Sequence, residues 1–146
     1  MMATYNFDDS QIHWNKLGDF EHLLYFIFHV NQETKIADVL FKFAANQQIV
    51  LHRHKAYNNT FVVQGEHRLY EANGKIKEIR PVGSYTVSPP NDEPHREGGG
   101  EQDVIVLFSI RGSDGVLYEI LDDDLNIITT ISLQDLVHLY QSQQTG

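Results

Sequence analysis

The sequence predicts an all-β fold, a single jelly-roll β-barrel followed by a short C-terminal helix. From Ile36 to Ile131, apolar and polar residues alternate with a period of two in successive stretches, which is typical of strands with one buried face. Turn signals separate these stretches, and a series of short strands with almost no helix favours a barrel or a sandwich. With 146 residues, the chain is long enough for one domain with an apolar core.

The strands follow one another with few interruptions. The first clear strand begins at Ile36, and its buried face is expected to hold Ala37, Val39, Phe41 and Phe43. Further strands are expected at residues 49–54, 61–71, 75–80, 84–89, 103–110, 116–121 and 126–131. Asn73-Gly74 tolerates positive φ angles and predicts a hairpin turn. Residues 89–100 are rich in proline and glycine, so we expect a loop there.

One segment has the period of a helix. Its apolar residues recur at i, i+3, i+4 and i+7, at Leu133, Leu136, Val137 and Tyr140. Ser132 is the expected N-cap, with Asp135 three residues later. We therefore interpret residues 1–146 as a single domain with an N-terminal extension (1–35), a barrel (36–131) and a C-terminal helix (132–144). Residues 23–30 of the extension form a candidate edge strand.

Composition and charge exclude several classes of function. Eleven Lys and Arg against 20 Asp and Glu give a net charge of −9, which repels phosphate backbones and anionic lipids, so no nucleic-acid or membrane partner is expected. No apolar run approaches the roughly 20 residues of a membrane-spanning helix. The acidic N-terminus does not resemble a secretory signal, so we expect a cytoplasmic protein. Cysteine is absent, so a metal must be held by His, Asp, Glu or Asn.

A metal site is predicted at Leu51-His52-Arg53-His54. On a strand, His52 and His54 project from the same face and can converge on one ion. A third histidine, His95, follows about 40 residues later, where a hairpin and two more strands can bring the chain back beside the pair. Three histidines at a buried point would form an open metal site with positions left for water or substrate.

Several neighbouring residues are candidates for a further ligand or for a supporting role. Asn58 is either a weak fourth ligand or a turn residue, and we favour the turn. His67 is predicted to point inward, where a core histidine is favoured over a proton carrier. Glu66, Glu93 and Glu97 lie close to the histidines, and one of them is a candidate for a carboxylate ligand.

The spacing of these residues resembles the two motifs of the RmlC-like cupin superfamily. The first motif is Gly, five residues, His-x-His, three or four residues, Glu, six residues and Gly. It is matched by His52, His54 and Gly65, with Asn46 in place of the first Gly and Asn58 in place of the Glu. The second motif, Gly, five residues, Pro-x-Gly-x-x-His, three residues and Asn, is matched at Gly83, Pro89 and His95. It has one extra residue before the histidine, with Asp92 in place of Gly and Gly99 in place of Asn.

Without the Glu of the first motif, the chain looks like the three-histidine branch of the superfamily, similar to acetylacetone-cleaving and dihydroxyacetophenone dioxygenases. The resemblance implies a non-haem Fe(II) dioxygenase that cleaves a carbon–carbon bond of a small diketone or hydroxyketone. His52, His54 and His95 would be its metal ligands. Zinc-binding cupin domains of anti-sigma factors resemble this group too, so a non-catalytic, ligand-binding or regulatory module is the alternative.

The chemistry of three imidazoles suits the first interpretation. Neutral ligands leave the full charge on the ion, which attracts an anionic bidentate substrate. Fe(II) is favoured, and Zn, Ni and Mn are also compatible with imidazole. We expect an aromatic pocket lined by Phe41, Phe43, Phe61 and Phe108. Because barrels of this shape expose edge strands, we also expect a homodimer.

Overall fold

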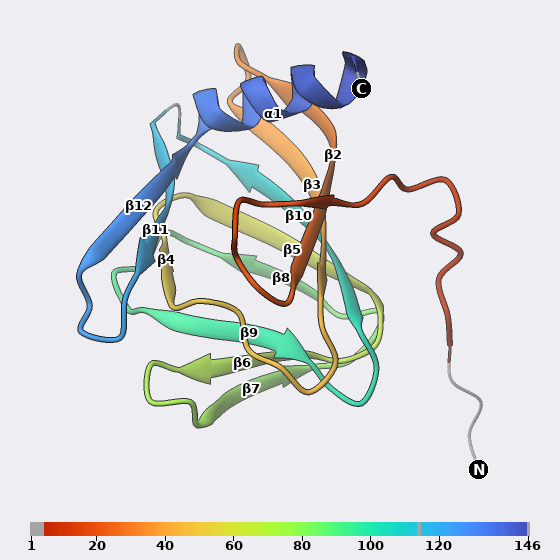
Figure 1. The fold of residues 1–146 in the computed structure, drawn as a ribbon, viewed down its shortest axis with the longest axis vertical. Helices are drawn as coiled ribbons and strands as arrows, with labels where there is room; N and C mark the ends of the chain where they lie inside the picture. Colours follow the sequence, from red (N-terminus) through yellow and green to blue (C-terminus); the bar gives the residue numbers. More distant parts are fainter. Residues whose placement is uncertain (1–4, 114, 146) are drawn as a thin grey trace.

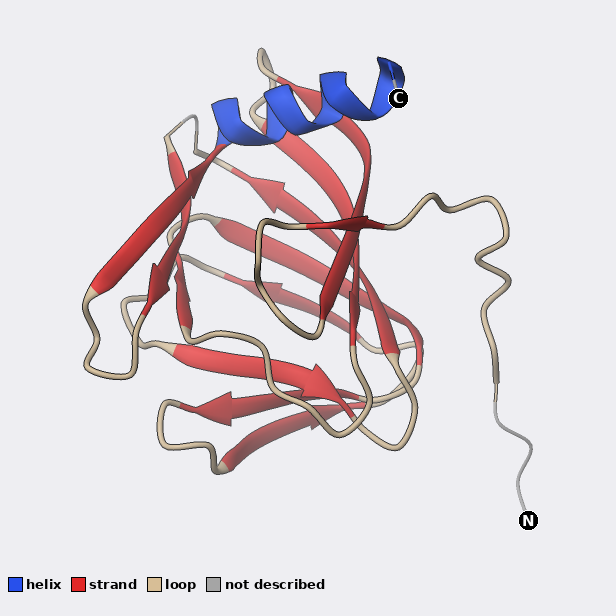
Figure 2. Ribbon diagram, viewed as in Figure 1, coloured by secondary structure: helices blue, strands red, loops and turns tan. Residues whose placement is uncertain are grey.

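Two antiparallel sheets of six strands face one another in the computed structural model, which describes residues 5–113 and 115–145 (Figure 1). Sheet A has the order β1 (Asn15–Lys16), β2 (Leu23–Asn31), β3 (Ile36–Phe43), β10 (Val104–Arg111), β5 (Tyr57–Gln64) and β8 (Tyr85–Ser88). Sheet B has the order β12 (Ile127–Ser132), β11 (Val116–Leu121), β4 (His52–His54), β9 (His95–Gly99), β6 (His67–Glu71) and β7 (Ile76–Arg80). The single described helix, α1 (Leu133–Thr145), lies across one end of the two sheets (Figure 2).

The core lies between the inner faces of the sheets. The predicted face of β3 is buried as expected, at Ala37, Val39, Phe41 and Phe43. On the neighbouring strand β10, Val106 and Phe108 point the same way and are also buried. The period of two therefore identified the inner face of β3 correctly.

The sheets do not join into the single closed barrel that we expected. Among the described strands, β1 and β8 form the edges of sheet A, and β12 and β7 form the edges of sheet B. A barrel and a two-sheet sandwich have the same alternation of buried and exposed residues, so the sequence pattern does not separate them. The expected edge strand at residues 23–30 is β2, but it is one strand in from the edge, between β1 and β3.

Two stretches differ from the sequence expectation in ways that matter for the site. The strand expected at residues 61–71 is divided at Gly65, which has a φ of 75°. A Cβ at Gly65 would lie 3.0 Å from the backbone oxygen of Asp103, so the chain passes too close for a side chain. The loop expected at residues 89–100 contains a strand, β9. The glycines and prolines of this stretch predict a loop. In the structure, however, Gly98 and Gly99 belong to the strand and allow other parts of the backbone to pack closely against it.

The C-terminal helix begins at the predicted cap. The backbone N–H of Asp135 donates to the Ser132 hydroxyl, and the backbone N–H of Ser132 donates to the Asp135 carboxylate, which is a reciprocal capping box. Gln143 fastens the far end of the helix to β2 through two hydrogen bonds of 2.9 Å with the backbone of Ile27. No helix in the described part of the chain is long and apolar enough to span a membrane.

Candidate metal centre

Three histidines and one glutamate meet on the inner face of sheet B. His52 and His54 alternate along β4, and His95 and Glu97 alternate along β9, so all four side chains project to the same side. The register pairs His52 directly with His95 across the two strands. Strand pairing thus brings together residues that lie more than 40 positions apart in the sequence.

The four side chains converge on one point. One ligand atom from each lies within 4.8 Å of the ligand atoms of the other three. The Nε2 atom of His54 lies 3.1 Å from the Nε2 atoms of both His52 and His95. The Glu97 carboxylate oxygen Oε2 lies 2.6 Å from His52 Nε2 and 3.4 Å from the Nε2 atoms of His54 and His95.

The donor set fits a single divalent cation. His52 Nδ1 lies 2.8 Å from the backbone oxygen of Val50, so with its proton on Nδ1 the ring would donate there and leave the Nε2 lone pair for an ion. Three imidazole nitrogens and a carboxylate oxygen are ligands that zinc, iron, nickel and manganese accept. His52, His54, His95 and Glu97 are therefore the residues that could hold a metal.

Glu97 is also held from behind by a fourth histidine. Its second oxygen, Oε1, accepts a hydrogen bond of 2.7 Å from Nε2 of His67, which is fully buried. The Nδ1 atom of His67 has no hydrogen-bond partner, so His67 contributes only this one bond to the site. His67 points inward as predicted, but Phe61, which was expected on the same face, points outward because the strand is divided at Gly65. Its hydrogen bond to Glu97 makes His67 a support for the carboxylate.

Burial and hydrogen bonding set the charges of the cluster. Burial, the largest influence, lowers the pKa of His54 to about 3, although the hydrogen bond to Glu97 opposes this shift. Burial also lowers the pKa of His95. Burial alone would raise the pKa of Glu97, but side-chain hydrogen bonds from His52, His54, His67 and His95 outweigh it and hold this pKa well below its usual value. The cluster therefore presents neutral imidazoles at His54 and His95 beside an ionised carboxylate.

Asn58 is inside the molecule, but its amide is already bonded elsewhere. Its Oδ1 accepts a hydrogen bond of 2.7 Å from the Tyr118 hydroxyl, and its Nδ2 donates to the backbone oxygen of Ala56 over 3.0 Å. Asn58 lies within strand β5, so the favoured turn was wrong. The first cupin motif would place a carboxylate at position 58, whereas the carboxylate that lies beside the histidines here is that of Glu97, on the same strand as His95.

Replacing Asn58 by alanine should therefore leave the metal content unchanged. It should lower the free energy of unfolding by about 1–3 kcal/mol, because the buried Tyr118 hydroxyl loses its acceptor. Elemental analysis and urea unfolding of the variant and the wild type measure the two effects. A large loss of metal would instead make Asn58 a ligand.

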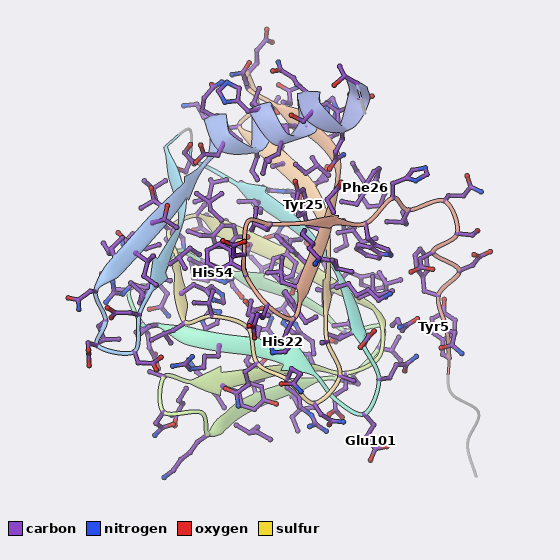
Figure 3. All side chains as sticks on the ribbon, in the orientation of Figure 1. Tyr5, His22, Tyr25, Phe26, His54 and Glu101 are labelled. Atoms are coloured by element: carbon purple, nitrogen blue, oxygen red, sulfur yellow. The ribbon has the colours of Figure 1, made fainter. Side chains whose placement is uncertain are left out.

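Two cavities of different character meet at the cluster. A small apolar cavity of about 50 Å³ lies towards α1 and is lined by His52, Glu97, Phe41, Phe43 and Phe108 among others. A larger one of about 290 Å³ is lined by His54, His95 and Glu97 and by residues of the edge strands β7 and β8. Figure 3 shows His54 inside the ribbon, away from the side chains at the rim. The cluster can thus be reached from the β7–β8 side.

Three of the four predicted pocket phenylalanines line the apolar cavity, and Phe61 does not. Phe61 is 42% exposed, on the outer face of sheet A, because the residues of β5 that point inward are Asn58, Thr60, Val62 and Gln64. Aromatic residues outside and polar residues inside reverse the usual pattern of a strand. The polar residues that alternate along β5 were the sequence signal for a polar site. A pattern based on hydrophobicity alone places Phe61 inside and these polar residues outside, which is the wrong way round.

Comparison with known proteins identifies the fold but no near relative. No protein-family model matches the chain, and no curated protein matches it. Among solved structures, an RmlC-like cupin protein from Ralstonia eutropha has a TM-score of 0.74 at 18% identity, covering 99% of this chain and 88% of that one. An acetylacetone dioxygenase from Acinetobacter johnsonii has a TM-score of 0.71 at 13% identity, covering 97% and 93%. A DMSP lyase from Ruegeria pomeroyi has a TM-score of 0.58 at 14% identity, covering 76% and 61%.

The chain therefore has the cupin fold that its motifs predicted, with a cluster that could bind a metal. The same fold carries a dioxygenase in one of these proteins and a lyase in another. Fold alone consequently does not select a reaction, which depends on the side chains of the site.

Proposed function

We propose that this protein is a metal-dependent cupin enzyme that binds Fe(II) and cleaves a carbon–carbon bond of a small diketone or hydroxyketone with O₂. His52, His54, His95 and Glu97 would hold the ion. The observation that carries the proposal is that this buried cluster opens onto a cavity of about 290 Å³, large enough for a small molecule. Similarity in fold to an acetylacetone dioxygenase supports the same class of substrate.

When bound, the metal would supply a Lewis acid for an anionic bidentate ligand and, as iron, a redox centre for O₂. The protein supplies the surroundings. Phe41, Phe43 and Phe108 keep the inner side of the cluster apolar and exclude water from it. His67 fixes one oxygen of Glu97, so that the other points at the histidines.

Glu97 changes the charge that a substrate meets. A divalent ion held by neutral imidazoles and one carboxylate carries a single net positive charge, whereas three imidazoles alone would leave two. The attraction for an anionic substrate is therefore weaker than the sequence predicted. An anionic substrate would therefore bind more tightly if a positively charged side chain elsewhere in the pocket also contacted it.

The alternative function is a zinc-binding module without turnover. The observation that favours it is the presence of four protein ligands, because structural zinc sites are closed by four ligands and catalytic sites keep a position open. The two functions differ in the metal and in whether a small chelating molecule can still reach it.

Elemental analysis of protein purified without added metal, followed by O₂ uptake with acetylacetone, tests the proposal. We expect about one iron per chain and O₂ consumption that stops when the diketone is exhausted. Zinc at full occupancy with no O₂ uptake would favour the module. A chain without any bound metal would contradict both functions.

We also propose that the protein forms a homodimer through the outer face of sheet A. Phe28, Phe61 and Tyr85 are 44%, 42% and 61% exposed there and line one surface groove. Exposed aromatic clusters of this kind are common at protein interfaces. Light scattering at micromolar concentration should give twice the mass of the chain, and Phe61→Glu should halve it. A monomer in the wild type would contradict this assembly.

A further inference from the structure

An arginine occupies an inward-facing position beside the metal cluster. Arg80 is the last residue of β7 and pairs directly with His67 of β6 in the register of sheet B. Directly paired residues project from the same face, so Arg80 points towards the interior as His67 does. Its side chain is only 11% exposed. Burying a guanidinium group costs free energy unless hydrogen bonds or an opposite charge compensate for the water that it loses.

The contacts of Arg80 leave part of its guanidinium available. Nε donates to the Glu78 carboxylate, and Nη1 makes a long hydrogen bond of 3.4 Å to the Thr60 hydroxyl on the opposite sheet. Nη2 has no hydrogen-bond partner among the described residues. The Glu78 side chain is 48% exposed and can turn towards solvent, which would free the face of the guanidinium that it now covers.

The surroundings of Arg80 form the polar half of the space between the sheets. Arg80 lines the same cavity of about 290 Å³ as His54, His95 and Glu97. Facing it across the cavity, β5 and β8 present small polar side chains, at Asn58, Thr60, Thr86 and Ser88. A molecule that reaches the histidines from the β7–β8 side therefore lies within a chamber that contains this guanidinium.

We infer that Arg80 binds a carboxylate of the substrate, so that the substrate is a small ketoacid anion with chelating oxygens at one end and a carboxylate at the other. This inference rests on the proposed function and names its substrate class. A guanidinium forms two parallel hydrogen bonds with a carboxylate, which fixes orientation as well as charge. Arg80 also supplies the positive charge that Glu97 removes from the metal site. Without a ligand, Arg80 pairs with Glu78, so a substrate carboxylate has to displace Glu78 from the guanidinium.

The experiment compares two ligands that differ in one carboxylate, acetylacetone and 2,4-dioxopentanoate. Both are titrated by calorimetry into protein loaded with Ni(II), whose content is first measured by elemental analysis. The ratio of the two affinities is compared between variants, so that the different acidities of the free ligands cancel. The variants are Arg80→Gln and Glu78→Gln. Arg68→Gln is the matched control, because Arg68 pairs with Glu66 on the outer face of the same hairpin.

In Arg80→Gln we expect the affinity for 2,4-dioxopentanoate to fall about tenfold or more, with acetylacetone changed by less than about twofold. Glu78→Gln should shift the ratio in the opposite direction, because it removes the competing carboxylate. Arg68→Gln should leave the ratio unchanged. The opposite sign for Glu78→Gln keeps the test decisive even if Arg80→Gln folds poorly.

An unchanged ratio in both Arg80→Gln and Glu78→Gln would overturn this inference and leave the diketone proposal standing. Failure of both ligands to bind metal-loaded wild type would overturn the two together. A wild-type protein that takes up no metal would overturn the proposed function, and the inference with it.

Discussion

Glu97→Gln is expected to weaken the binding of a divalent metal by about a hundredfold or more. The substitution keeps the size of the side chain and removes the only negative charge of the donor cluster. Loss of a residue that merely supports a ligand costs about 10–100-fold in affinity, and loss of a charged ligand should cost at least as much. Glu97 makes close contacts with all three candidate histidine ligands, and this position is the one expected of a fourth ligand.

Competition with a chromophoric chelator measures this affinity, and the histidines provide the internal comparison. His52→Ala and His95→Ala should each remove most of the bound metal, because the remaining ligands hold an ion weakly. Glu66→Gln is the matched control, since Glu66 lies near the site in sequence but pairs with Arg68. Unchanged metal content in His52→Ala and His95→Ala would place the site elsewhere and remove the basis of the proposed function.

The sequence predicted the cluster residues that share one strand better than those that need tertiary pairing. His52 and His54 are two apart, and the period of a strand is enough to place them on one face. His95 was predicted because a hairpin and two more strands were expected to bring it back beside the pair. Glu97 was only one of three candidate carboxylates, because β9 was interpreted as a loop and a loop has no alternation to pair Glu97 with His95.

The missed strand has a physical cause in its glycines. Gly98 and Gly99 end β9 where the backbone of residues 43–48 crosses it, and a Cβ at Gly98 would overlap the backbone of Gln47. Local propensity reads such glycines as a loop, whereas the structure uses them for close approach between backbones. Arg80 was missed for a related reason. An arginine beside a turn is normally exposed, and only the pairing with His67 shows that it points inward.

Acidification is expected to destabilise the metal-free protein, beginning near pH 6.5. His54 has a pKa of about 3 in the folded protein against 6.5 for an ordinary histidine. Between these values the unfolded chain binds a proton that the folded chain does not, so the free energy of unfolding falls as pH falls. One such group gives a slope of about 1.4 kcal/mol per pH unit. The lowered pKa values of His95 and Glu97 act in the same direction.

Urea unfolding of metal-free protein between pH 7 and pH 4 measures the slope, and one substitution assigns it. His54→Gln should reduce the slope by about 1.4 kcal/mol per pH unit, because the unfolded variant no longer gains that proton. His138→Gln is the control for the same substitution outside the cluster, since His138 is exposed on α1. A stability that stays flat down to pH 5 in the wild type would mean that burial does not hold His54 neutral. Protons would then compete with the metal for His54 in mild acid, as they do at exposed histidines, and the cluster would release its metal there. If His54 instead stays neutral, no proton competes with the metal for its nitrogen over this pH range.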